Sequence, residues 1–327
     1  MRVTLSVLLI LTMLALLEDS ASPQRQPQAP RIGLLVVSGS AATSGEQPIR
    51  HFFLPALQEL GYVDGRSIII EYRNAEGQID RLPHLAADLI RLKVSVIVAS
   101  GPLAIAPAMK ATKTIPIVMV GGGDPVGRGF VKSLSLPGGN VTGLSSDARG
   151  SDGKRLELLK EAFPRIARVA ILKPLGRRKV SVDNYERAAR ALGVNLETVD
   201  VHSPAELELA LSKITSVRSD ALITMREVLS IQYALQIAEF ALKKRLLAMY
   251  EGEAFVKAGG LMSYDVNFQA LWRRGAFYVD KILKGANPAL LPVEMPEFKF
   301  VINLATAKKI GCTIPPEILL EANEVIK

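Results

Sequence analysis

The chain has 327 residues, of which 49% are hydrophobic, and its formal net charge at pH 7 is +8. This length and composition exclude disorder for most of the chain and leave room for two domains, each with its own core. The single cysteine, Cys312, excludes an intramolecular disulfide, so stability has to come from packing. A basic surface of this kind could meet nucleic acid or an anionic membrane.

The first 22 residues are predicted to be a secretory signal peptide. Arg2 gives a positive start, and residues 3–17 form an apolar run too short to span a hydrocarbon core of roughly 30 Å. Asp19, two places before Ala21, weakens the cleavage signal, so a permanent N-terminal anchor is the alternative. Residues 23–30, rich in Pro and Gln, are expected to form a linker. Export favours a periplasmic protein without a nucleic-acid partner.

From residue 31 onward, apolar runs rich in Val and Ile alternate with stripes of helical spacing. This pattern is typical of a parallel sheet covered by helices. One stripe covers residues 53–60 and stops at Gly61, as expected for a helix that ends on glycine. The first five expected strands are residues 32–37, 68–72, 94–99, 117–120 and 141–144.

The same alternation starts again after the polar stretch 145–153, which predicts a second lobe. The fold class is therefore expected to be α/β, with two Rossmann-like lobes, parallel sheets and a cleft between the lobes. The tail is too small to fold alone and is assigned to both lobes. The N-terminal lobe is expected to comprise residues 31–146 and 265–292, and the C-terminal lobe residues 147–264 and 293–327. The second set of strands is expected at residues 169–172, 196–201, 221–224, 246–250 and 261–264, with a further strand at 298–302.

The sequence contains no complete motif for catalysis or cofactor binding. Residues 121–126 place Val126 where a dinucleotide loop needs its last glycine, and Arg128 stands where a phosphate loop needs Lys. His51, His84 and His202 are scattered, so no metal site is predicted. The sequence also lacks the G-x-S-x-G pattern of a serine hydrolase. Neither an enzyme nor a cofactor is expected.

Parallel α/β sheets bind ligands beyond the carboxyl ends of their strands, where loops and helix N-termini expose N–H groups. Hydroxyls and glycine amides there would suit a carboxylate, Asp124 could pair with an ammonium group, and Tyr250 or Tyr264 could stack on an apolar group. The alternatives are that Ser100 and Asp124 cap helices or turns, and that Arg226 pairs with Glu227 or faces solvent. The candidate ligand-binding residues are Ser38, Ser40, Ser100, Gly101, Gly123, Asp124, Lys173, Arg226, Tyr250, Tyr264 and Asp265.

Several segments resemble one family. Residues 116–120 read PIVMV, residues 123–127 read GDPVG and residues 137–143 read PGGNVTG, with further matches at 60–65, 258–264, 278–285 and 314–316. This pattern resembles the ABC transporter substrate-binding proteins related to tryptophan and tyrosine binders. The resemblance implies a type I periplasmic binding protein fold, three crossovers between the lobes, an ABC permease as partner and no catalysis.

The chain departs from that family pattern in the expected ligand loops. Gly101 stands where Thr is common, Lys173 and Arg226 replace other residues at the ends of two strands, and Asp265 follows Tyr264 where Gly is usual. These changes make an aromatic amino acid less expected, and the two cations would suit a more acidic ligand.

The expected function is therefore that of the periplasmic solute-binding component of an ABC importer. It would bind an amino acid or a related small organic anion between its lobes by hinge closure. The alternative is a non-catalytic ligand-sensing domain that informs a membrane signalling partner. An exported hydrolase is a third possibility, but the candidate loops lack a nucleophile and base pair.

Overall fold

The computed structural model describes residues 29–37, 48–148, 150–174, 179–225 and 231–327. The predicted signal peptide and most of the predicted linker lie outside these residues, as do three candidate ligand residues, Ser38, Ser40 and Arg226. Within the described residues, no helix is both long and apolar enough to cross a membrane.

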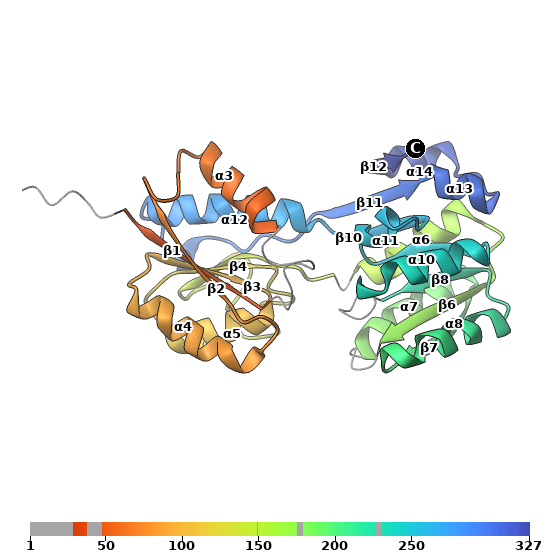
Figure 1. Ribbon diagram of the computed structural model, residues 1–327, viewed down its shortest axis with the longest axis horizontal. Helices are drawn as coiled ribbons and strands as arrows, with labels where there is room; N and C mark the ends of the chain where they lie inside the picture. Colours follow the sequence, from red (N-terminus) through yellow and green to blue (C-terminus); the bar gives the residue numbers. More distant parts are fainter. Residues whose placement is uncertain (1–28, 38–47, 149, 175–178, 226–230) are drawn as a thin grey trace, which may run out of the picture.

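The first lobe is built on a parallel sheet in the order β2-β1-β3-β4-β5. Helices α3 and α12 cover one face of this sheet, and α4 and α5 cover the other (Figure 1). Because both faces are covered, all four residues of β4 are buried, which explains its uninterrupted apolar sequence. The elements are β1 (Arg31–Val36), η1 (Ile49–Phe53), α3 (Leu54–Glu59), β2 (Ile69–Asn74), η2 (Ile79–Arg81), α4 (Leu82–Arg91), β3 (Val96–Ser100), α5 (Pro102–Ala111), β4 (Ile117–Val120), β5 (Val141–Leu144), α12 (Phe268–Leu283) and η4 (Pro288–Leu290).

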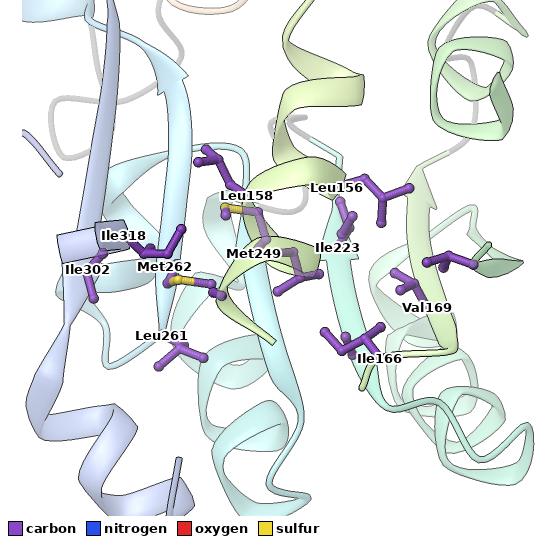
Figure 2. Packing of buried hydrophobic residues seen from close by; sticks show 14 of the residues in the cluster. Leu156, Leu158, Ile166, Val169, Ile223, Met249, Leu261, Met262, Ile302 and Ile318 are labelled. Atoms are coloured by element: carbon purple, nitrogen blue, oxygen red, sulfur yellow. The ribbon is translucent and has the colours of Figure 1, made fainter. Parts of the chain in front are cut away.

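The second lobe contains a sheet in the order β12-β11-β10-β9-β8-β6-β7, in which only the β10–β11 pair is antiparallel. Leu156 and Leu158 of α6 lie with Val169, Ile223 and other strand residues in the core on one face (Figure 2). Helices α8, α10 and α11 cover the opposite face. The elements are α6 (Ser151–Ala162), β6 (Arg168–Pro174), α7 (Lys179–Leu192), β7 (Asn195–Val201), η3 (Pro204–Glu206), α8 (Leu207–Ser216), β8 (Ala221–Thr224), α10 (Ala234–Lys243), β9 (Leu247–Tyr250), α11 (Glu253–Lys257), β10 (Met262–Val266), β11 (Phe298–Asn303), α13 (Leu304–Ile310), α14 (Pro316–Glu321) and β12 (Glu324–Ile326).

The predicted α/β class with two lobes and mostly parallel sheets is confirmed. Each expected strand is present, with ends that differ by at most two residues. The strand expected to end at Tyr264 continues to Val266, because Asp265 and Val266 still pair with Lys299 and Phe298 of β11. β12 was not predicted, since it has only three residues. The exact division of the chain between the lobes stays a prediction.

Three connections join the lobes. The first crossing (residues 145–150) leads from β5 to α6, the second (Asn267) from β10 to α12, and the third (residues 291–297) from η4 to β11. Backbone hydrogen bonds tie them together. The N–H of Ser145 donates to Glu294 O at 2.9 Å, and that of Asn267 donates to Glu297 O at 2.7 Å. The crossings therefore form one bonded group.

Candidate ligand site

In both sheets, the carboxyl ends of the parallel strands lie toward the crossings. β5 ends at Leu144, where the first crossing leaves the first lobe, and β10 ends at Val266, where the second crossing leaves the second lobe. All strands parallel to β5 and β10 end at the same edges, so the carboxyl edge of each sheet is turned toward the other lobe (Figure 1). This is the position at which α/β sheets bind ligands.

On the first lobe, β3 and β4 bring four candidate residues to neighbouring positions. Ser100 is the last residue of β3, and Gly101 follows it with a φ of 77° and donates its N–H to Val120 O at 3.0 Å. Gly101 itself occupies the N-cap position of α5, and no side chain caps that helix. The alternative that Ser100 is the cap is therefore wrong, and its hydroxyl does not serve α5.

The loop after β4 is held by two serines of the first crossing. Ser145 Oγ donates to Gly123 O at 2.7 Å, and Gly123 N–H donates to Ser146 Oγ at 3.0 Å. Asp124 Oδ1 accepts from Gly127 N–H at 2.9 Å, which confirms the turn-capping alternative for this residue. Sequence reasoning missed both serines, although they stand directly after an expected strand. Their contacts make the Gly123 loop a preformed edge of the site.

On the second lobe, the two candidate tyrosines pack within the protein. Tyr250 is fully buried and stacks on Phe255, with ring centroids 4.9 Å apart. Burial raises the pKa of Tyr250, and its hydroxyl has no hydrogen-bond partner among the residues that the structure describes. Tyr264 is partly buried and stacks on Phe298 at 5.2 Å. Both rings therefore have aromatic partners inside the second lobe.

The cation at the end of β6 also has an internal partner. Lys173 Nζ lies 2.9 Å from Asp200 Oδ1 of the neighbouring strand β7, and the two side chains are 26% and 43% exposed. This is a half-exposed ion pair of modest strength. An acidic ligand would have to compete with Asp200 for Lys173.

Arg155 of α6, which the sequence analysis did not single out, makes contacts with several residues at this edge. Its Nε donates to Tyr264 O at 2.7 Å, and Nη1 donates to Asp152 Oδ1 at 2.9 Å and to Glu251 Oε1 at 3.1 Å. Nη2 lies 3.9 Å from Asp265 Oδ1. The side chain of Arg155 is 1% exposed. Burial lowers its pKa, but attraction from Glu251 and the other carboxylates outweighs this and leaves the pKa raised, so Arg155 is charged.

The network extends to α7 through Tyr185, which is fully buried. Tyr185 Oη lies 3.2 Å from both Arg155 Nη1 and Glu251 Oε1, accepting from the guanidinium and donating to the carboxylate. Burial raises the pKa of the Tyr185 hydroxyl well above its usual value, so it stays protonated. Asp265, a candidate from the sequence, thus lies beside a buried charged network.

The sequence contains a signal that Arg155 is buried. In α6, Asp152 and Arg155 fall at helical spacing with Leu156, Leu159 and Ala162, all of which are buried. A charged pair in the apolar stripe of a helix indicates a buried ionic contact. Within the described residues, no group of three or more His, Cys, Asp or Glu could hold a metal ion.

Two facing α/β lobes joined by three crossings define the class of two-lobed ligand-binding proteins. The chain matches the model of the ABC transporter substrate binding protein family over residues 37–326, and it belongs to that family. The family expected from the sequence is therefore confirmed.

Individual relatives agree with this assignment. The chain is 27% identical over 261 residues to a tyrosine-binding protein of Clostridioides difficile (strain R20291), covering 79% of this chain and 75% of the relative. It is similar to the structure of an ABC domain in complex with L-Trp from Streptococcus pneumonia, with a TM-score of 0.76, 27% identity, and 91% and 99% of the two chains covered. A ligand-free, open substrate binding protein from Clostridium difficile gives a TM-score of 0.74 at 24% identity, covering 91% and 99% of the two chains, and supports the fold.

Proposed function

We propose that this protein is the periplasmic solute-binding component of an ABC importer and that it binds an amino acid between its lobes without catalysing a reaction. The observation that carries this proposal is the pair of carboxyl edges turned toward each other across three bonded crossings. Ligand contacts to both edges would stabilise a closed form, which a membrane permease would recognise. Family membership supports the role in transport.

An amino acid is favoured over a dicarboxylate for two reasons. The relatives named above bind tyrosine and L-Trp. In addition, Lys173, one of the two cations that favoured an acidic ligand, already pairs with Asp200. On the first lobe, the Ser100 hydroxyl would donate to the ligand carboxylate beside the Gly123 loop. The proposed ligand contacts on the first lobe are Ser38, Ser40, Ser100, Gly101, Gly123 and Asp124, and those on the second are Lys173, Arg226 and Asp265.

The test uses purified protein and a panel of the L-amino acids with small dicarboxylates as the comparison group. A true ligand at a hundredfold excess over its Kd stabilises the folded state by about 2.7 kcal/mol and so raises Tm. The same ligand should reduce the radius of gyration in small-angle X-ray scattering. We expect L-tyrosine or L-tryptophan to give both effects. A panel that changes neither Tm nor the radius of gyration contradicts the proposal.

The transport role is tested in cells. Deletion of the gene should abolish uptake of the identified ligand, and turnover of that ligand by the purified protein should be absent. Normal uptake combined with an altered response of a membrane kinase would instead support the ligand-sensing alternative.

A further inference from the structure

Arg155 connects the two points at which the chain first enters and then leaves the second lobe. It lies in the second turn of α6, which begins where the first crossing ends. Its Nε holds the carbonyl of Tyr264, and its Nη2 faces Asp265, the residue that precedes the end of β10 and the second crossing. One side chain therefore fixes the first crossing relative to the second.

The same guanidinium holds the carboxyl end of β9. Glu251 directly follows β9, is 3% exposed and accepts from Arg155 Nη1 at 3.1 Å. Asp265 is 8% exposed, and its Oδ1 accepts the N–H of Val266 at 2.8 Å. These residues belong to the carboxyl edge of the second sheet, so Arg155 sets the geometry of the edge that would face the ligand.

Stability alone is a poor reason for such an arrangement. Burying a guanidinium and carboxylates costs several kcal/mol per ion, and apolar residues of similar volume often stabilise a core at least as well. An ionic network of this kind instead fixes directions, because the planar guanidinium donates along set lines. The Tyr264 ring stacks on Phe298, the first residue after the third crossing. The contacts of Arg155 with Tyr264 are therefore connected to the third crossing as well.

We propose that Arg155 is a positioning residue for ligand binding, which acts through Glu251, Asp265 and the Tyr264 carbonyl. It holds the second-lobe half of the ligand site in register with the crossings, so that hinge closure brings this edge to the ligand in one orientation. This inference rests on the proposed function as a two-lobed binding protein.

The test compares Arg155→Lys with Leu211→Ala, both made in the full chain. Lysine keeps the positive charge but loses the planar set of donors. Leu211 is buried in α8, in the core cluster on the opposite face of the sheet, so its truncation lowers Tm without changing the network. The pair separates loss of stability from loss of positioning.

The first readout is hydrogen exchange of the ligand-free proteins. The N–H groups of Val266 and Asn267 donate to Asp265 Oδ1 and Glu297 O, so their exchange reports on the second crossing. We expect Arg155→Lys to accelerate exchange of both amides by about tenfold relative to the wild type, and Leu211→Ala to leave them unchanged. Equal exchange in Arg155→Lys and the wild type would overturn the inference, whether or not a ligand is known.

The second readout is binding of L-tyrosine and L-tryptophan by calorimetry together with small-angle scattering. For an amino acid that the wild type binds, we expect Arg155→Lys to raise Kd by about tenfold or more and to weaken the decrease in radius of gyration. An unchanged Kd would overturn the inference while leaving the proposed function in place. Failure of the wild type to bind either amino acid would count against the proposed ligand, and the exchange result would still decide the role of Arg155.

Discussion

Gly143 lies in β5 opposite Met119 of β4, and the two backbones approach too closely for a side chain. A Cβ on Gly143 would lie 2.4 Å from Met119 O and 2.8 Å from Met119 N, and the φ of this residue is 122°. Both facts exclude any residue other than glycine without strain. Because Met119 contributes backbone atoms here, the neighbour cannot move aside as a flexible side chain could.

Replacing Gly143 with alanine should therefore destabilise the protein by at least about 2 kcal/mol, from the unfavourable φ and the backbone clash together. The measurement is Tm and chemical unfolding of the variant. Gly139→Ala is the matched control, since nothing lies within 4 Å of a Cβ built there and its φ is not positive. Equal losses in the two variants would show that the clash relaxes at little cost.

For Tyr250 and Arg155, the sequence predicts the surrounding element but not the side-chain contacts. The end of β9 was predicted, but not that the Tyr250 ring packs on Phe255 and against Gly260, which leaves it fully buried. Arg155 donates hydrogen bonds to Glu251 and Tyr264, which are 96 and 109 residues away in the chain. Local spacing indicates that a residue is buried, but it does not reveal a partner that distant.

Among the elements, the third crossing is fixed to the first lobe by α12. Arg274 donates from Nε and Nη2 to the two carboxylate oxygens of Glu294, at 2.8 and 2.7 Å. Tyr278 Oη donates to Pro292 O at 2.6 Å. On the other side, Phe298 already pairs with Val266 in the second sheet. The third crossing is therefore held at Glu294 by the first lobe and at Phe298 by the second.

The Arg274–Glu294 pair predicts a pH dependence. The hydrogen bonds from Arg274 lower the pKa of Glu294 below its ordinary value of 4.5. A lowered folded-state pKa contributes stability that is present above pH 4.5 and is lost as the pH falls through the folded pKa. Arg274→Gln should therefore lower the free energy of unfolding near neutral pH, by less than about 1 kcal/mol because the pair is partly exposed to solvent.

The measurement is urea unfolding of the wild type and Arg274→Gln over a pH series. The difference between them should shrink as the pH falls below 4.5 and through the lowered folded-state pKa of Glu294. The same substitution in a Glu294→Gln background should have little effect at any pH. A difference that is independent of pH would show that Arg274 stabilises the crossing by packing alone.

The elements themselves were largely predictable, because a parallel sheet covered on both faces leaves long apolar runs, as in β4 and β8. The short β12 was not, since three residues carry no periodicity. The carboxyl-edge rule located Ser100, Gly101, Gly123 and Asp124 at neighbouring strand ends. The contacts of Ser145 and Ser146 with that loop depend on where the first crossing passes, which the sequence does not specify.

For the whole molecule, the hydrophobic cores of the two lobes are separate except for a small apolar contact beside the crossings. Two clusters of buried residues belong to the first sheet and its helices, and two belong to the second sheet. Among the described residues, the two sheets share a cluster at one place only, where Val266 at the end of β10 and Phe298 at the start of β11 pack with the first-lobe core. The lobes are joined by the three crossings and this small contact, while most of each core lies within one lobe, so each lobe is expected to unfold as its own cooperative unit.

Calorimetry of the ligand-free protein should therefore resolve two transitions, and Gly143→Ala should lower the one that belongs to the first lobe while leaving the other in place. A ligand that contacts both carboxyl edges binds only when both lobes are folded, so it adds its binding free energy to whichever lobe unfolds first. The lower transition should rise most and approach the upper one. A single transition that shifts as a whole in Gly143→Ala would mean that the crossings and the contact at Val266 and Phe298 transmit stability between the lobes, and closure would then start from a stiffer molecule.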